Sequence, residues 1–129
     1  MSGPWHFLLV DDDPDKRHLI AHYLTRSFPS ASVFECSSGA EAIDYLKLHS
    51  VSAILTDHSM QPVNGIELIQ WTRRIHPEIP ILMVTGHPAI EQEALHAGAT
   101  LVVSFGRFAE IGQILARLLN EKSPRPERF

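Results

Sequence analysis

The chain has 129 residues, of which 44% are hydrophobic, and this is enough for one compact domain with a buried core. Its net charge of −4 at pH 7 argues against direct contact with nucleic acid, because binding to phosphates needs a surplus of basic side chains. The single cysteine, Cys36, excludes an internal disulfide and suits the reducing cytoplasm. Uninterrupted apolar runs are too short to cross a membrane, and the first ten residues lack a signal-peptide pattern.

Apolar runs alternate with amphipathic segments along the chain, which predicts five β/α units. Several runs are continuously apolar, as is typical of central strands in a parallel sheet that is covered by helices on both faces. We therefore predict a single doubly wound, five-stranded parallel α/β sheet. The domain is expected to cover residues 1–121, followed by a polar tail or linker start at 122–129. The predicted strands are 6–10, 31–35, 52–57, 80–85 and 100–104.

Helix-start signals divide the chain in the same way. Asp13 is followed by proline, which favours the first helical position, and Ser38 has a glutamate three residues later, which is a capping-box pattern. In the first helix we expect the basic side chains of Lys16, Arg17 and Arg26 to stay in solvent, opposite an apolar stripe. The predicted helices cover 14–27, 38–49, the segment between the turns QPVNG and HPEIP, 88–97 and 107–121.

Acidic residues stand where two of the predicted strands end. Asp11 and Asp12 follow the first strand, Asp57 closes the third, and Thr85 closes the fourth. Ligands of open parallel sheets bind at the carboxyl ends of the strands, so neighbouring first and third strands would place these side chains in one crevice. Three close carboxylates repel one another, and Mg²⁺, which prefers hard oxygen ligands, relieves that repulsion. An aspartate beside such an ion can attack phosphorus and become an aspartyl phosphate. The alternative for a strand-end aspartate is a helix N-cap, the role we assign to Asp13.

At these residues the chain resembles the receiver domain of bacterial two-component response regulators, over about residues 5–120. The resemblance lies in "LLVDDDP", "LTDHSMQPVNGIEL", "HPEIPILMVTG" and "HAGA". It implies a flavodoxin-like strand order, 2-1-3-4-5, and Mg²⁺-dependent phosphorylation by a sensor histidine kinase or phosphotransfer protein. It implies a cytoplasmic signalling domain rather than an enzyme that turns over a metabolite, and the output partner is open. The implied roles are phosphoacceptor for Asp57, Mg²⁺ ligands for Asp12, Asp57 and the Ser59 carbonyl, a metal-bound water for Asp11, and a phosphoryl-sensing hydroxyl for Thr85.

The chain also departs from the receiver pattern. Phe105 stands where receivers usually carry a lysine after the fifth strand, and the nearest cation in sequence is Arg107. Val102 stands at the position of the aromatic residue that usually takes part in the switch. Phe105 either packs over the site or fills the core near the last helix, and both interpretations stay open. The loss of the lysine predicts slower, weaker or dispensable phosphorylation.

Three other interpretations are open. The domain could be a pseudo-receiver, a protein-interaction module that works without phosphorylation. It could be a phosphatase of the haloacid-dehalogenase type, because Asp11 and Asp13 end the first strand in the required spacing, although the lysine and the further acids of that family are missing. His18 and His22 lie four residues apart on a helix and could bind zinc, although no third ligand is in register.

Overall fold

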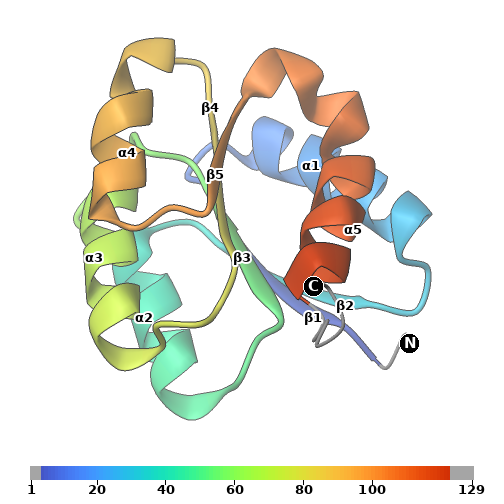
Figure 1. Cartoon of the computed structure of the whole chain (residues 1–129), viewed down its shortest axis with the longest axis horizontal. Coiled ribbons are helices and arrows are strands. Elements are labelled where there is room, and N and C mark those ends of the chain that lie inside the picture. Colours follow the sequence, from blue (N-terminus) through green and yellow to red (C-terminus); the bar gives the residue numbers. More distant parts are fainter. Residues whose placement is uncertain (1–3, 123–129) are drawn as a thin grey trace, which may run out of the picture.

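The computed structural model describes residues 4–122, in which strands and helices alternate as predicted (Figure 1). The strands are β1 (His6–Val10), β2 (Ser32–Cys36), β3 (Ala53–Thr56), β4 (Ile81–Thr85) and β5 (Leu101–Ser104). The α-helices are α1 (Pro14–Ser27), α2 (Gly39–Leu48), α3 (Gly65–Ile75), α4 (Glu91–Ala97) and α5 (Ile111–Lys122). Short 3-10 helices precede the last two α-helices, and they are η1 (Pro88–Ile90) and η2 (Phe105–Glu110).

The strands form one parallel sheet in the order β2-β1-β3-β4-β5, which confirms the predicted doubly wound architecture. Strand β1 lies between β2 and β3, and the backbone N–H of Asp57 donates to the carbonyl of Val10 at 3.0 Å. The carboxyl ends of β1 and β3 are therefore tied side by side. This is the point at which the winding of the sheet reverses and where ligands of such sheets bind.

The second strand begins and ends one residue later than predicted, at Ser32–Cys36 instead of 31–35. The N–H of Ala31 donates to the carbonyl of Phe28 in a turn, which removes residue 31 from the ladder. At the other end Cys36 pairs with Val10 and is only 1% exposed. Pairing with β1 therefore sets the limits of this strand, and the local apolar pattern does not.

The sheet separates two apolar cores, as Figure 1 shows for the helices on either side. Helices α2, α3 and α4 pack on one face and contribute Leu46, Leu68 and Ala94 to its core. Helices α1 and α5 cover the other face and contribute Leu24 and Leu115, among others. All residues of β3 and β4 are buried, in agreement with the continuous apolar runs of the sequence.

Side-chain caps fix the starts of three helices. Asp13 caps α1 as predicted, because its carboxylate accepts two backbone N–H groups of the first turn. Ser38 accepts the N–H of Glu41 at 3.1 Å, but the Glu41 carboxylate bonds the residue before Ser38, so this capping box is incomplete. A reciprocal capping box joins Asn64 and Glu67 at the start of α3, a cap that we did not predict within the turn QPVNG.

The last helix begins later than the predicted residue 107. Residues Phe105–Glu110 form the 3-10 helix η2, and Arg107 inside it has non-helical angles (φ −97°, ψ 26°), so the regular α-helix starts at Ile111. Lys122 ends α5, and the remainder of the predicted tail, 123–129, lies outside the described residues.

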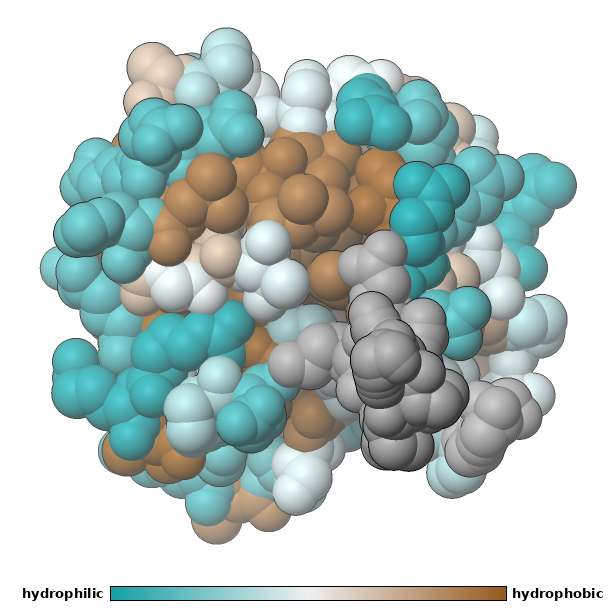
Figure 2. Space-filling model, viewed as in Figure 1, coloured by the Kyte–Doolittle hydropathy of each residue, from teal (hydrophilic) through white to brown (hydrophobic). Residues whose placement is uncertain are grey.

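On the face drawn in Figure 2, apolar side chains gather around β5 between α4 and α5. Leu95 of α4 and Leu101 of β5 each leave 37% of their surface exposed. Exposed apolar side chains in such numbers are ordinary on a globular domain. Within residues 4–122, no helix combines the length and the apolar character needed to cross a membrane.

The close approach of α3 to the end of β3 depends on Gly65, and this gives a test of the fold. A Cβ atom at Gly65 would lie 2.2 Å from the carbonyl oxygen of Asp57, whereas a Cβ at the exposed Gly86 would meet nothing within 4 Å. We expect Gly65→Ala to lower the free energy of unfolding by roughly 1–3 kcal/mol, because backbone has to move. The matched control Gly86→Ala should change it by less than about 0.5 kcal/mol. Urea unfolding followed by circular dichroism measures both, and equal stability of the two variants would contradict the argument.

Candidate functional site

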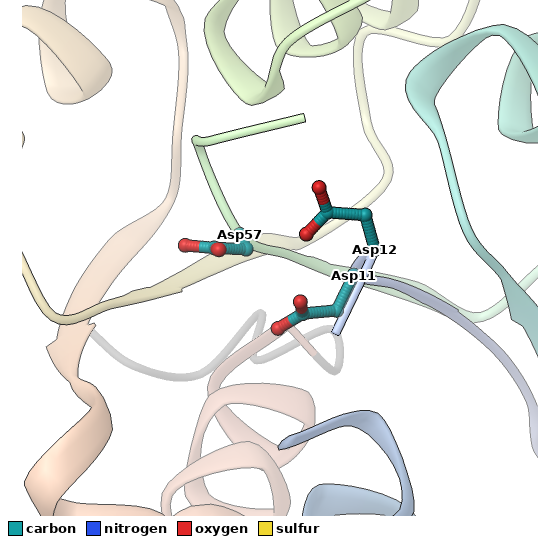
Figure 3. A group of neighbouring side chains, drawn as sticks. All are labelled: Asp11, Asp12 and Asp57. Atoms are coloured by element: carbon teal, nitrogen blue, oxygen red, sulfur yellow. The ribbon is translucent and has the colours of Figure 1, made fainter. Parts of the chain in front are cut away.

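The ends of β1 and β3 bring three carboxylates together. Asp11 and Asp12 directly follow β1, and Asp57 directly follows β3. One carboxylate oxygen from each of the three lies within 4.8 Å of the other two. Figure 3 shows the three side chains extending to the same side of the strand ends. The structure thus gathers the predicted acids into one cluster, which we call the acid cluster.

Two members of the acid cluster are buried and incompletely hydrogen-bonded. Asp11 is 1% exposed and Asp57 is 5% exposed, while Asp12 lies at the surface. Asp11 Oδ1 accepts the backbone N–H of Asp13 at 2.9 Å. Among residues 4–122, however, Asp11 Oδ2 and Asp57 Oδ1 meet no hydrogen-bond donor. Buried carboxylate oxygens without a donor are costly, so this set of hard oxygen atoms fits a small divalent cation such as Mg²⁺.

Burial also changes the acidity of the cluster. It raises the pKa of Asp11 from 3.8 to about 6, and the neighbouring charge of Asp57 adds to this effect. The N–H of Asp13 and the ammonium of Lys16 act in the opposite direction. The ionised form of Asp11 is therefore less stable in the folded chain than in water, because burial outweighs the attraction to Lys16.

The other predicted site residues lie around the acid cluster. Ser59 and His58 line a surface hollow next to Asp12. Thr85 ends β4, the strand beside β3, and is 1% exposed. Its hydroxyl oxygen accepts the backbone N–H of His87 at 3.1 Å. The roles of the Ser59 carbonyl as a metal ligand and of the Thr85 hydroxyl as a phosphoryl sensor stay predictions.

Two basic side chains that we expected in solvent are part of the site, and that prediction was wrong for them. Lys16 Nζ donates to Asp57 Oδ2 at 3.3 Å and lies 3.8 Å from Asp11 Oδ2. Arg17 donates to the carbonyl of Asp11 at 2.7 Å and to the carboxylate of Glu35 at 3.0 Å. Lys16 is attracted to the carboxylates of the acid cluster, whereas Arg17 is held beside the cluster by Glu35 and by the backbone of Asp11. The sequence contained an indirect signal for this. Three close carboxylates favour a nearby cation, and Lys16 and Arg17 lie in the first turn of the helix that follows Asp11 and Asp12.

The atypical positions have different surroundings. Phe105 is half-buried and packs on the α1 and α5 side of the sheet, and its ring centre lies 5.0 Å from Lys16 Nζ. It therefore fills core and also contacts the cation of the site, which joins the two interpretations that we left open. Arg107 instead pairs with Glu110 at 2.8 Å, with a side chain that is 56% exposed. Val102 is half-buried against the core on the α2, α3 and α4 side.

His18 and His22, the alternative zinc pair, meet no third ligand among residues 4–122. In the part of the chain that the structure describes, the acid cluster is the only group of three or more potential metal ligands. His18 is exposed and lies 3.8 Å from the carboxylate of Glu35, and His22 packs edge-on against Tyr23. A zinc site built on His18 and His22 therefore finds no support in this geometry.

The raised pKa of Asp11 predicts how stability depends on pH without metal. A carboxyl with a raised folded pKa stabilises the protein below its ordinary pKa, and this contribution is lost as the pH rises to about 6. In EDTA at about pH 7, Asp11→Asn should therefore be more stable than the wild type, by up to about 3 kcal/mol. Urea unfolding of both proteins at about pH 4.5 and about pH 7 measures the difference, which should shrink at the lower pH. A difference that is independent of pH would contradict this.

Proteins of known family resemble this chain in sequence and identify its family. The chain matches the response regulator receiver domain family over residues 7–104. It is 33% identical over 102 residues to the transcriptional regulatory protein GlrR of Escherichia coli (strain K12), a match that covers 79% of this chain but only 22% of that protein. It is 38% identical over 96 residues to a chemotaxis protein CheY homolog of Campylobacter jejuni, which covers 70% of this chain and 73% of that one.

Solved structures agree with the sequence matches. The signal receiver domain of NarL from Mycobacterium tuberculosis superposes with a TM-score of 0.79 at 25% identity, covering 91% of this chain and 97% of that one. The family match includes the whole acid cluster and, apart from His6 at the start of β1, all residues of the five strands. The chain therefore belongs to the response regulator receiver domain family, as the sequence motifs had indicated.

Proposed function

We propose that this receiver domain is a phosphoacceptor, in which Asp57 takes a phosphoryl group in an Mg²⁺-dependent reaction from a sensor histidine kinase or a phosphotransfer protein. The observation that carries the proposal is the pair of buried carboxylate oxygens, one on Asp11 and one on Asp57, that meet no donor among residues 4–122. They lie in a cluster whose ligand atoms are within 4.8 Å of one another. Such a cluster is suited to hold a metal ion and to place a nucleophilic carboxylate beside it.

The chain's own oxygen atoms supply the metal ligands in this proposal. Asp12 and Asp57 would bind Mg²⁺ directly, together with the carbonyl of Ser59, and Asp11 would hold a metal-bound water. When bound, Mg²⁺ neutralises charge on the phosphoryl oxygens during transfer. Asp12 and Ser59 are exposed and line the same hollow, so this side of the site is open to a donor group from solvent.

The transfer itself needs one nucleophile and one leaving group. A carboxylate oxygen of Asp57 attacks phosphorus and forms a P–O bond while the P–N bond of the donor phosphohistidine breaks. The bonding electrons return to the imidazole nitrogen, and an acyl phosphate remains on Asp57. Thr85, at the end of the neighbouring strand, would then turn its hydroxyl from the N–H of His87 toward the phosphoryl oxygens.

The wider setting is part of the proposal. We place the domain, residues 1–121, in the cytoplasm, as a signalling domain that passes its state to an output partner without contacting nucleic acid or membrane itself. A relative such as GlrR is described as a transcriptional regulatory protein, and the chain spans about a fifth of it, 22%. Any output activity of that kind would belong to a segment or partner outside this domain.

A second candidate is a pseudo-receiver that binds its partner without phosphorylation. The observation that favours it is Phe105, an apolar ring at the position where the receiver pattern has a lysine. The two candidates differ in one measurable property, which is the formation of an acyl phosphate on Asp57. The third candidate, a phosphatase of the haloacid-dehalogenase type, differs from both in releasing product from a generic phosphomonoester.

Phosphorylation from a small donor separates these candidates. Incubated with acetyl phosphate and Mg²⁺, the protein should gain the mass of one phosphoryl group, and the gain should disappear with EDTA or in Asp57→Asn. Intact-mass spectrometry measures the gain, and an established receiver domain treated in parallel shows that the donor is active. An unlabelled protein beside a labelled reference would favour the pseudo-receiver. Steady turnover of p-nitrophenyl phosphate would favour the phosphatase.

A further inference from the structure

Lys16 occupies a position in α1 from which its ammonium reaches the acid cluster. The carboxylate of Asp13 accepts the backbone N–H of Lys16 at 3.4 Å, so the first helical turn is fixed beside the strand ends. The ammonium donates to Asp57 Oδ2 at 3.3 Å and lies 3.8 Å from Asp11 Oδ2, and the side chain is 24% exposed. The cation thus contacts the carboxylate that is the proposed phosphoacceptor.

The ring of Phe105 contacts the same ammonium from another side. Lys16 Nζ lies 5.0 Å from the ring centre, within the range of a cation–π interaction. Phe105 is the first residue after β5, and its ring is held by the core on the α1 and α5 side and by Phe108. The ring of Phe105 and the carboxylates of Asp11 and Asp57 therefore restrict the position of the ammonium. A freely moving surface lysine would not be restricted in this way.

Neighbouring arginines are engaged elsewhere. Arg17 is bound to Glu35 and to the backbone of Asp11, and Arg107 is paired with Glu110 at the surface. Among residues 4–122, the cation that forms an ion pair with Asp57 is Lys16. A phosphoryl group on Asp57 would carry roughly two negative charges near neutral pH, so its attraction to this ammonium would be strong.

We propose that Lys16 is the cationic ligand of the phosphoryl group on Asp57, presented from α1 and held by the ring of Phe105, in place of a lysine at the end of β5. This rests on the proposed phosphorylation of Asp57. The ammonium donates to phosphoryl oxygens as the Asp57 oxygen bonds to phosphorus and the bond from phosphorus to the leaving group breaks. It acts by charge and hydrogen bonding and is itself unchanged by the reaction.

The same geometry makes Lys16 a competitor of Mg²⁺ in the unphosphorylated domain. Its ammonium pairs with Asp11 and Asp57, two of the carboxylates proposed to surround the metal. Removing one positive charge from such a site strengthens the binding of a divalent cation. Loss of Lys16 should therefore have opposite effects, tighter Mg²⁺ binding and slower phosphorylation, whereas simple damage to the site would weaken both.

The experiment compares Lys16→Met, Phe105→Lys, the double variant and the exposed control Lys47→Met. Labelling of Asp57 by acetyl phosphate with Mg²⁺, in which acetate leaves, is followed by intact-mass spectrometry. We expect Lys16→Met to be labelled about 10- to 100-fold more slowly than the wild type, because a charge-assisted contact is lost. In the double variant the new ammonium at the end of β5 should restore most of the rate. Calorimetry should show tighter Mg²⁺ binding to Lys16→Met, and Lys47→Met should match the wild type in both measurements.

Each outcome decides between the two proposals. If the wild type is labelled and Lys16→Met is labelled at the same rate, the assignment of Lys16 is overturned while the proposed function stands. If the wild type is not labelled beside an active reference receiver, both fail. Should Lys16→Met not fold, Lys16→Gln replaces it, since glutamine also removes the positive charge but keeps a polar side chain. A wild-type labelling rate in Lys16→Gln would also overturn the assignment.

Discussion

Electrostatic repulsion among the carboxylates at the ends of β1 and β3 is the constraint on which the site depends. The apolar sheet creates this repulsion, because burying β1 beside β3 brings Asp11 and Asp57 together, and the Asp57 N–H bond to Val10 fixes their distance. The backbone N–H of Asp13 and the ammonium of Lys16 counter it only in part. One oxygen of each buried acid meets no hydrogen-bond donor among residues 4–122. Packing of the hydrophobic core therefore holds two carboxylates in an arrangement that favours the binding of a cation.

Helix α1 serves both the fold and the site. Its Ile20 and Leu24 are buried in the core shared with α5, which sets the axis of the helix against the sheet. Asp13 fixes the first turn, and that turn carries Lys16 toward the acid cluster. On the other side, Gly65 lets α3 begin against the carbonyl of Asp57. The proposed phosphoacceptor is therefore held between two helices whose positions are determined by packing and not by the site residues themselves.

Local sequence patterns predicted a parallel sheet with helices on both faces, whereas the strand order, which makes β1 and β3 neighbours and so brings the three acids together, was implied by the resemblance to receiver domains. Continuous apolar runs mark buried parallel strands, and residues after such strands meet at one edge. The limits of β2 were missed because pairing with β1, a long-range contact, decides them. Lys16 was missed for a related reason. Helical periodicity assigns a lysine opposite the apolar stripe to solvent, and only the fold shows that the carboxylates lie on its side of the helix. The Asn64 cap was readable, since glutamate stands three residues later.

The position of Lys16 determines which elements respond first to charge on Asp57. Its ammonium contacts the Asp57 carboxylate on one side and the ring of Phe105 on the other, so α1 contacts the acid cluster directly and η2 is linked to the cluster through Lys16. These two segments pack against each other and against α5. A phosphoryl group would replace one carboxylate charge by roughly two, at a larger distance from the backbone, and would draw the ammonium outward from the ring. If Lys16 is the cation that binds the phosphoryl group, a change at Asp57 would therefore reach α1 through Lys16 and reach η2 through the cation–π contact with the ring of Phe105. Packing would pass the change on to α5.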